Sequence, residues 1–416
     1  MWRNDGALEG LSLMPSKGIR DKTIGDRRGR KGLRILWHSV SPLATTGYGN
    51  VTRELTHRIR DLGHFVRVGT KHGDHKWYEV DGIEIFDGVD TLLVNRMLED
   101  DAFDYIITMW DIWLLYEKRQ YPKEKWVASI PVDTEWISAA LEEVCKSVGM
   151  PMAMSLHGKR ELESTGLKDV LYAPLGFDEK TFRPIPEARA AFRKELGLTE
   201  DNFVIGSVGL NYGDDRKGFI PLMLAFKDFH DRYPEARLFL HTAANERGVL
   251  AGSVNYHKIV GQLGLHDFVL WPDQPSILQS RIDAGWLAEI YNGFDVMCLA
   301  SKGEGFGLPL IEAQACGIPV ITTNSTTGPE LTKSGWLINV DADDKNWIDT
   351  GTWRLEPKPS RIHDALELAH HAWHTGAIRA MKDRAVKDIA EYRWDAVWER
   401  YWLPVLATME ARLDRG

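Results

Sequence analysis

Short apolar runs alternate with amphipathic segments along the first part of the chain. Residues 33–40 (LRILWHSV) form an apolar run of strand-forming residues, and a polar loop with glycines follows at 41–50. Residues 51–63 show helical spacing and end at a glycine, and 64–70 (HFVRVGT) form the next apolar run. A strand, a glycine-containing loop, a helix and a second strand predict a βαβ unit with a parallel sheet.

The same alternation continues and then starts again after residue 200. Further strands are expected at 103–110, 125–133 and 152–157. The second series has expected strands at 202–211, 236–243, 266–273, 294–301, 318–324 and 335–340, with helices near 219–233 and 284–293. The irregular tract 173–189 contains three prolines and separates the two series. Two α/β domains with a cleft between them follow, with ligands beyond the carboxyl ends of the strands.

We therefore expect four parts in the chain. They are a basic arm at 1–32 without ordered structure, a first α/β domain at 33–178, a second α/β domain at 179–392 and a terminal helical segment at 393–416. In the terminal segment Trp394, Val397, Tyr401 and Val405 fall on one stripe, which predicts one long helix.

Composition narrows the class of protein. The chain has 416 residues, of which 44% are hydrophobic and 27% charged, as in a globular protein with a sizeable core. It contains no apolar stretch of about 18 residues that would span a membrane, and its first residues do not resemble a secretory signal. Three scattered cysteines, Cys145, Cys298 and Cys316, are too few for a disulfide framework. A reducing, cytoplasmic setting is expected.

The charge distribution is uneven. The formal net charge is −9, yet residues 15–34 contain eight Lys/Arg and two Asp, a local charge of +6. One interpretation of this basic arm is a solvated leader. The other is contact with a polyanion, either DNA or an anionic membrane surface. The sequence leaves both open.

The segment 301–323 (SKGEGFGLPLIEAQACGIPVITT) carries the strongest chemical signal. An apolar strand ends near its start, three closely spaced glycines follow, and Pro309 marks the first turn of a helix. A helix N-terminus offers unpaired N–H groups and a positive dipole end, which suit a phosphate or sugar hydroxyls. Glu304 and Glu312 could reach different parts of an extended ligand. The alternatives are a tight turn for the glycines and a solvated helix face for Glu312.

These residues resemble a known family. EGFGLPLIE followed by ACGIPVI is similar to the E-x7-E region of retaining glycosyltransferases of family 4. Weaker matches occur in the same order at 44–50, 154–166, 171–184 and 204–219, so that the resemblance covers roughly residues 33–413. It implies the GT-B fold, an α/β architecture of two Rossmann-like domains whose parallel sheets face a central cleft. It also implies that the terminal helix crosses back to the first domain.

The resemblance implies roles for individual residues. Arg216 and Lys217 would neutralise the departing diphosphate, a form of electrostatic stabilisation, and Glu304 would hold donor-sugar hydroxyls. Asp133 falls where many relatives have a histidine and could orient the acceptor hydroxyl; an N-cap for the following helix is an equally open alternative. Asp111 is a similar, weaker case. The implied donor-binding residues are Gly47, Gly49, Phe306, Gly307, Leu308 and Glu312, the last at the nucleotide ribose.

Other polar residues receive a structural interpretation. His38 and His157 are expected at strand ends facing the cleft, where a lone histidine is more often structural than catalytic. Asp341-Ala342-Asp343 has the D-x-D pattern of a different glycosyltransferase fold but lies in a polar loop and is expected to be a surface turn. We expect no metal and no cofactor, since the family generally uses cationic side chains and helix ends in that role.

The resulting hypothesis is a metal-independent retaining hexosyltransferase. It would move a sugar from a nucleotide-diphosphate donor, such as UDP-glucose or GDP-mannose, to a hydroxyl of a glycan, a lipid-linked glycan or a small molecule. A first alternative is transfer to hydroxylated bases in DNA. A second is a catalytically inactive sugar- or polyanion-binding protein. An epimerase or phosphorylase is disfavoured by the E-x7-E context.

Overall fold

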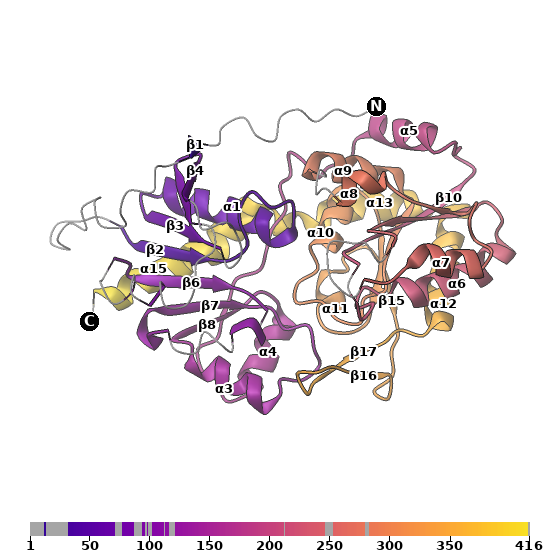
Figure 1. Ribbon diagram of the computed structural model, residues 1–416. Coiled ribbons are helices and arrows are strands. Elements are labelled where there is room, and N and C mark those ends of the chain that lie inside the picture. Colours follow the sequence, from indigo (N-terminus) through magenta and orange to yellow (C-terminus); the bar gives the residue numbers. More distant parts are fainter. Residues whose placement is uncertain are drawn as a thin grey trace.

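The chain forms two α/β domains that lie side by side in the computed structural model (Figure 1). The described residues are 12–13, 32–70, 77–86, 94–95, 98, 102–111, 113–115, 121–211, 213–245, 253–278 and 283–414. Both domains are built on mainly parallel sheets, and this is the fold class that the sequence predicted. Most of the basic arm lies outside the described residues, but Ser12–Leu13 form strand β1, so the expectation of an arm without ordered structure is wrong there.

The first domain is built on a nine-stranded sheet with the order β1-β4-β5-β3-β2-β6-β7-β8-β9. Its strands are β1 (Ser12–Leu13), β2 (Arg34–His38), β3 (Phe65–Gly69), β4 (Trp77–Val80), β5 (Ile83–Phe86), β6 (Tyr105–Met109), β7 (Trp126–Ile130), β8 (Met150–Ala153) and β9 (Leu171–Tyr172). The β1–β4 and β4–β5 pairs are antiparallel, and the other pairs are parallel. The antiparallel β4–β5 hairpin was not predicted, although its Asp81-Gly82 turn, with φ of 49° and 76°, is a typical hairpin signal.

The helices of the first domain follow the sheet strands. They are α1 (Gly47–Asp61), α3 (Ala139–Ser147) and α4 (Leu156–Ser164), with a 3-10 turn at Lys123–Lys125. The expected strand at 152–157 is wrong in its second half. Ser155 caps α4 by accepting a hydrogen bond from Gly158 N at 2.9 Å, so the chain turns into a helix there. His157 therefore lies on a helix and not at a strand end.

The second domain is built on a six-stranded parallel sheet with the order β12-β11-β10-β13-β14-β15. Its strands are β10 (Phe203–Val208), β11 (Ala236–His241), β12 (Val269–Leu270), β13 (Val296–Leu299), β14 (Val320–Thr323) and β15 (Gly335–Ile338). Its helices are α5 (Pro186–Glu195), α6 (Phe219–Arg232), α7 (Tyr256–Gln262), α8 (Gln274–Leu278), α9 (Ala284–Gly293), α10 (Leu308–Ala315), α11 (Gly328–Leu331), α12 (Pro359–His374) and α13 (Ile378–Asp388). Residues of α6, α7 and α12 pack on one face of the sheet, and residues of α5, α9 and α10 on the other.

A short antiparallel hairpin projects from the second domain after β15. It consists of β16 (Lys345–Trp347) and β17 (Trp353–Leu355), and Figure 1 places it at the lower boundary between the two domains. Backbone N–H of Glu135 donates to the carbonyl of Trp353 at 3.0 Å. The hairpin therefore binds directly to the chain segment that follows β7 of the first domain. Sequence analysis did not predict it.

The last segment is not one continuous helix. A 3-10 turn (Ile389–Tyr392) leads into α14 (Trp394–Val397), a π-helical turn (Trp398–Trp402) and α15 (Leu403–Leu413). Pro404 lies in the first turn of α15, and it lacks the N–H that a continuous α-helix would donate to the carbonyl of Arg400. The helical path therefore widens into a π-turn before the proline.

The terminal segment lies against the first domain, where Figure 1 shows it in yellow beside the indigo strands. Tyr105 Oη donates to the carbonyl of Met409 at 2.9 Å, and Trp402 Nε1 donates to the carbonyl of Pro174 at 3.3 Å. Because α15 follows the second domain in sequence and packs on the first, it ties the two domains together.

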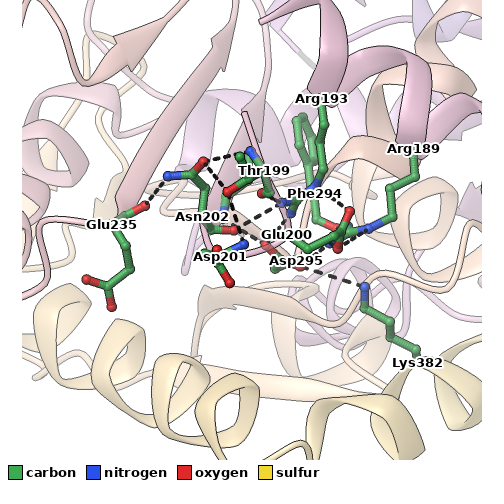
Figure 2. Close-up of polar contacts among 11 residues, drawn as sticks. Arg189, Arg193, Thr199, Glu200, Asp201, Asn202, Glu235, Phe294, Asp295 and Lys382 are labelled. Atoms are coloured by element: carbon green, nitrogen blue, oxygen red, sulfur yellow. Dashed lines mark hydrogen bonds and ion pairs between the residues drawn. The ribbon is translucent and has the colours of Figure 1, made fainter. Parts of the chain in front are cut away.

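A buried ion cluster attaches helix α5 to the central strands of the second domain's sheet (Figure 2). Asp295, just before β13, accepts from Arg193 Nη2 at 2.7 Å and from Arg189 Nη2 at 2.9 Å. Its carboxylate also accepts from Val204 N at 2.8 Å, and Lys382 Nζ of α13 lies 4.0 Å away. One carboxylate thus joins two helices to two central strands.

We expect Asp295→Ala to lower the free energy of unfolding by about 3–5 kcal/mol, because it leaves buried arginine charge without its partner. Urea denaturation of the full chain measures this. Asp231→Ala is the matched control, since Asp231 makes an exposed (i, i+4) pair with Lys227 and such pairs contribute about 0.3–0.5 kcal/mol. Equal midpoints for the two variants would contradict a structural role for the cluster.

Candidate active site

The glycine loop between β13 and α10 touches the first domain. A Cβ atom on Gly303 would lie 2.0 Å from the carbonyl oxygen of Asp133, and one on Gly305 would lie 2.5 Å from Cβ of Pro131. These two glycines therefore allow close approach across the cleft. Gly307, with φ of 105°, is the residue of the three that needs glycine for its backbone conformation. A tight strand-to-helix turn therefore explains the glycine at position 307 but not the glycines at positions 303 and 305.

Two helix N-termini lie close together at this loop. Helix α10 begins at Leu308 after Gly307, which has no side chain to cap it. Gly47 begins α1 of the first domain, and a Cβ there would lie 3.0 Å from Cδ1 of Leu308. Gly49 N–H donates to Thr46 Oγ1 at 3.2 Å, so this predicted phosphate contact is engaged within the loop. The positive ends of two helix dipoles thus meet in the cleft, as an anion would require.

Helix α6, like α1, has a side chain that caps its N-terminus. Both oxygens of Asp215 accept hydrogen bonds from the first turn, from Phe219 N at 3.1 Å and Ile220 N at 3.0 Å. Tyr256 Oη also donates to Asp215, at 2.8 Å. The N-terminus of α6 is therefore occupied by a carboxylate, and the loop before it contributes side chains to the cleft.

Those side chains form a compact charge cluster. Lys217 Nζ lies 2.6 Å from Glu304 Oε1, and Arg216 Nη1 lies 3.7 Å from Glu304 Oε2 and 3.5 Å from Asp133 Oδ2. Arg216 Nη1 also donates to the carbonyl of Gly303 at 2.8 Å. The structure thus brings together the four residues predicted as catalytic, one from the first domain and three from the second.

Glu304 and Arg216 stay charged in this largely enclosed cluster, whereas burial lowers the pKa of Lys217 despite its pairing with Glu304. Burial alone would raise the pKa of Glu304, but Lys217 and Arg216 hold it below its usual range. Burial likewise opposes the charge of Arg216, and the adjacent carboxylates of Glu304 and Asp133 raise its pKa instead. Each cation is neutralised by a carboxylate of the same site, so an incoming anion would have to replace that carboxylate.

Arg354 of the hairpin completes the cluster and was missed in the sequence. Its Nη2 donates to Asp133 Oδ2 at 2.8 Å and its Nη1 to Asp214 Oδ2 at 3.0 Å. Asp133 is therefore held by two arginines from the second domain. The alternative interpretation of Asp133 as an N-cap is wrong, because Ser138 occupies the N-cap position of α3.

Asp111 lies beside this cluster and has an altered acidity. Tyr48 Oη of α1 donates to Asp111 Oδ1 at 3.1 Å. Burial, followed by the nearby charge of Asp133, raises the pKa of Asp111 to about 6. The carboxyl ends of β6 and β7 thus present two acidic side chains to the cleft. Tyr48 was missed in the sequence, although it lies between the predicted donor-binding residues Gly47 and Gly49.

Glu312 is buried in α10, so the interpretation as a solvated helix face is wrong. Tyr291 Oη of α9 donates to Glu312 Oε2 at 3.0 Å. Burial raises the pKa of this carboxyl to about 7, despite the hydrogen bond from Tyr291, which lowers it. Phe306, another residue of the predicted donor site, is buried and packs edge-on against Tyr392 with ring centroids 5.9 Å apart. Only the backbone of Phe306 is therefore left to bind a ligand.

The remaining polar candidates have structural surroundings. His38 is buried beside Trp110, with Nδ1 3.2 Å from Tyr121 Oη, and His157 Nε2 lies 2.8 Å from the carbonyl of Thr134. Asp341 and Asp343 are exposed in a turn, as expected. Within the described residues, no helix combines the length and apolarity needed to cross a membrane.

Sequence comparison finds relatives that match mainly the second domain. The profile of the family Glycosyl transferases group 1 matches residues 203–350. The chain is 30% identical to D-inositol 3-phosphate glycosyltransferase of Segniliparus rotundus over 244 residues, 58% of this chain and 47% of that protein. It is also 30% identical to mannosylfructose-phosphate synthase of Agrobacterium fabrum over 254 residues, 59% of this chain and 51% of that one. The chain thus spans about half the length of these curated relatives.

Structural comparison extends the likeness to both domains. Sucrose-phosphate synthase from Thermosynechococcus elongatus superposes with a TM-score of 0.71 at 18% identity, over 91% of this chain and 99% of that one. Anabaena HepE in complex with UDP and glucose gives 0.66 at 15% identity, over 90% and 100%. At these identities the likeness concerns the fold. The chain therefore has the GT-B fold, and its second domain is similar to the group 1 glycosyltransferases.

Proposed function

We propose that the protein is a retaining glycosyltransferase that moves a hexose from a nucleotide-diphosphate sugar to an acceptor hydroxyl. One observation carries the proposal. Arg216 and Lys217 lie beside Glu304 in the same cleft where the N-termini of α1 and α10 lie close together. Two cationic side chains and two helix ends suit a diphosphate, and the flanking carboxylates suit sugar hydroxyls.

The ion pairs of Arg216 and Lys217 indicate where the donor would bind. A bound diphosphate would take over the positive charge of Arg216 and Lys217, which Glu304 neutralises in this structure. Glu304 would then be released to accept hydrogen bonds from the donor sugar. As the sugar–phosphate bond breaks, negative charge grows on the phosphate oxygen, and preorganised cations in a buried site stabilise this charge most effectively.

The acceptor end lies at the carboxyl ends of β6 and β7. Asp133 is fixed by Arg354 and Arg216, so its carboxylate is available in one orientation to position an acceptor hydroxyl. We infer front-face substitution. The bond from the anomeric carbon to phosphate breaks, the bond to the acceptor oxygen forms on the same face, and the acceptor proton passes to the departing phosphate.

The donor is inferred to be a nucleotide sugar such as UDP-glucose or GDP-mannose, and we place the reaction in the cytoplasm. Solved structures of Anabaena HepE contain UDP or UDP-glucose, and curated relatives are named for transfer to inositol phosphate and for mannosylfructose-phosphate synthesis. We propose that Arg216, Lys217 and the helix ends replace a divalent ion. In the described part of the chain, no group of three or more His, Cys, Asp or Glu side chains is arranged to hold a metal.

The test is turnover of a panel of UDP- and GDP-sugars by the full chain, with and without EDTA.

We expect Lys217→Ala to reduce turnover of the preferred donor about 10²- to 10³-fold, as loss of one charge-stabilising donor typically does. Lys227→Ala, which removes an exposed lysine of α6, is the matched control and should keep the turnover of the wild type. The anomeric configuration of the product, read by NMR, tests retention.

Three outcomes would count against this proposal. Donor binding without hydrolysis or transfer would favour the inactive binding protein. Loss of activity in EDTA with recovery on Mn²⁺ or Mg²⁺ would contradict the metal-free reaction. Inversion of configuration would contradict front-face substitution.

Nucleotide affinity should depend on pH through Glu312. Its pKa of about 7 means that the carboxyl is mostly protonated at pH 6 and mostly ionised at pH 8. If the ionised form binds the ribose hydroxyls, UDP or GDP affinity should rise about tenfold over this range. Titration calorimetry of the wild type and Glu312→Gln measures this, and the variant should show a flat profile in this range. Glu289→Gln, on neighbouring α9, serves as control. An unchanged pH profile in Glu312→Gln would exclude the ribose assignment.

Gly303→Ala should depress turnover without unfolding either domain. Its new Cβ would lie 2.0 Å from the carbonyl of Asp133 and would force the glycine loop away from β7. We expect at least a tenfold loss of turnover, since displacement of catalytic groups by about 1 Å can cost 10²-fold. Gly285→Ala, where the nearest contact is 3.3 Å from a side-chain oxygen, is the control. A wild-type rate for Gly303→Ala would show that the close approach is not needed.

A further inference from the structure

Three tryptophans form an exposed aromatic cluster where the β16–β17 hairpin meets the first domain. Trp136 stacks on Trp353, with ring centroids 5.5 Å apart and an interplanar angle of 25°, and Trp347 packs on Trp353 at 5.0 Å. Trp353 is partly buried between the other two, whereas Trp347 is 61% exposed and Trp136 is 42% exposed. Exposed aromatic surface of this extent is a sign of a binding site.

The cluster is continuous with the acceptor end of the cleft. Trp347 and Trp353 are register partners on one face of the hairpin, while the alternate residue Arg354 projects to the other face and bonds to Asp133. At the tip of the hairpin, Thr350 lines a small pocket together with Asp133, Thr134 and Trp113. The hairpin therefore both holds the carboxylate of Asp133 and displays two of the three tryptophans, Trp347 and Trp353.

The charge around the cluster restricts what could bind there. Residues 341–358 contain five carboxylates and three Lys/Arg, a local charge of −2. All three cations are already engaged: Arg354 by Asp133 and Asp214, Lys358 by Asp344, and Lys345 by the ring of Trp353, with Nζ 4.7 Å from the ring centroid. A phosphate backbone or an anionic lipid surface would be repelled. An uncharged ligand with a flat apolar face and polar edges fits the tryptophans and the carboxylates together.

We propose that Trp136, Trp347 and Trp353 form a subsite for a sugar ring of an uncharged glycan acceptor, beyond the sugar that receives the transferred hexose. The C–H face of a pyranose packs on an indole ring, and its hydroxyls reach the flanking polar groups. This subsite rests on the proposed function and specifies its acceptor class. The enzyme extends an oligosaccharide or glycoside, and a free monosaccharide leaves the tryptophans unused.

The experiment uses the full chain and three probes: maltotriose, cellotriose and α-1,6-mannotriose. Binding is measured without donor by saturation-transfer NMR and titration calorimetry, and KM is measured with the preferred donor. At least one trisaccharide should bind. Trp347→Ala should weaken its binding and raise its KM about five- to tenfold, and Trp347→Phe should restore most of the affinity. UDP affinity and turnover with the corresponding monosaccharide should not change.

Leu368→Ala is the matched control, because Leu368 is also an exposed apolar side chain and lies on α12. Binding of none of the trisaccharides, or equal affinity in wild type and Trp347→Ala, would overturn the subsite. The subsite would also be overturned if the main effect of Trp347→Ala were a loss of binding to a DNA oligonucleotide or to phosphatidylglycerol vesicles. Because binding is read without donor, trisaccharide binding that depends on Trp347 in a protein without transferase activity would retain the subsite and reject the proposed function.

Discussion

The contact between the glycine loop and the end of β7 is the constraint on which the candidate site depends. The carbonyl of Asp133 lies where a side chain on Gly303 would begin, at 2.0 Å from an ideal Cβ. Only at this separation can Arg216 of the second domain reach the carboxylate of Asp133 in the first. Small residues at one loop thus bring two separate Rossmann-like domains together in a single candidate site, with Arg216, Lys217 and Glu304 on one wall and Asp133 on the other.

Charge balance explains how this site exists before a ligand arrives. Holding the partly buried Arg216 and Lys217 without partners would be destabilising, and Glu304 and Asp133 offset that cost by pairing with them. The same carboxylates are the groups expected to hold sugar hydroxyls. Under the proposed function, ligand binding is an exchange of ion pairs, in which the diphosphate replaces Glu304 as the partner of the cations. An exchange of this kind needs little reorganisation of the protein, which is the property that makes electrostatic catalysis effective.

Segments distant in sequence supply the coupling between the domains. The β16–β17 hairpin belongs to the second domain but pairs with Glu135 of the first and delivers Arg354 to Asp133. Helix α15 follows the second domain and packs on β6 through Tyr105. The two domains are therefore linked on both sides of the cleft, by the hairpin near the acceptor end and by the terminal helix behind the first sheet.

The sequence by itself determined the alternation of strands and helices, because a period of two or 3.6 residues is a local property of the chain. It also indicated Glu304, Glu312, Arg216 and Lys217, whose neighbours follow a family pattern. The Asp81-Gly82 pair is likewise a local signal for the β4–β5 hairpin, although the hairpin was not predicted. Only the tertiary structure decided that Arg354 bonds to Asp133 across 221 residues of chain, that Glu312 is buried against Tyr291 and that Gly303 permits the domains to touch. These features depend on which surfaces meet after folding, and no local periodicity encodes such a meeting.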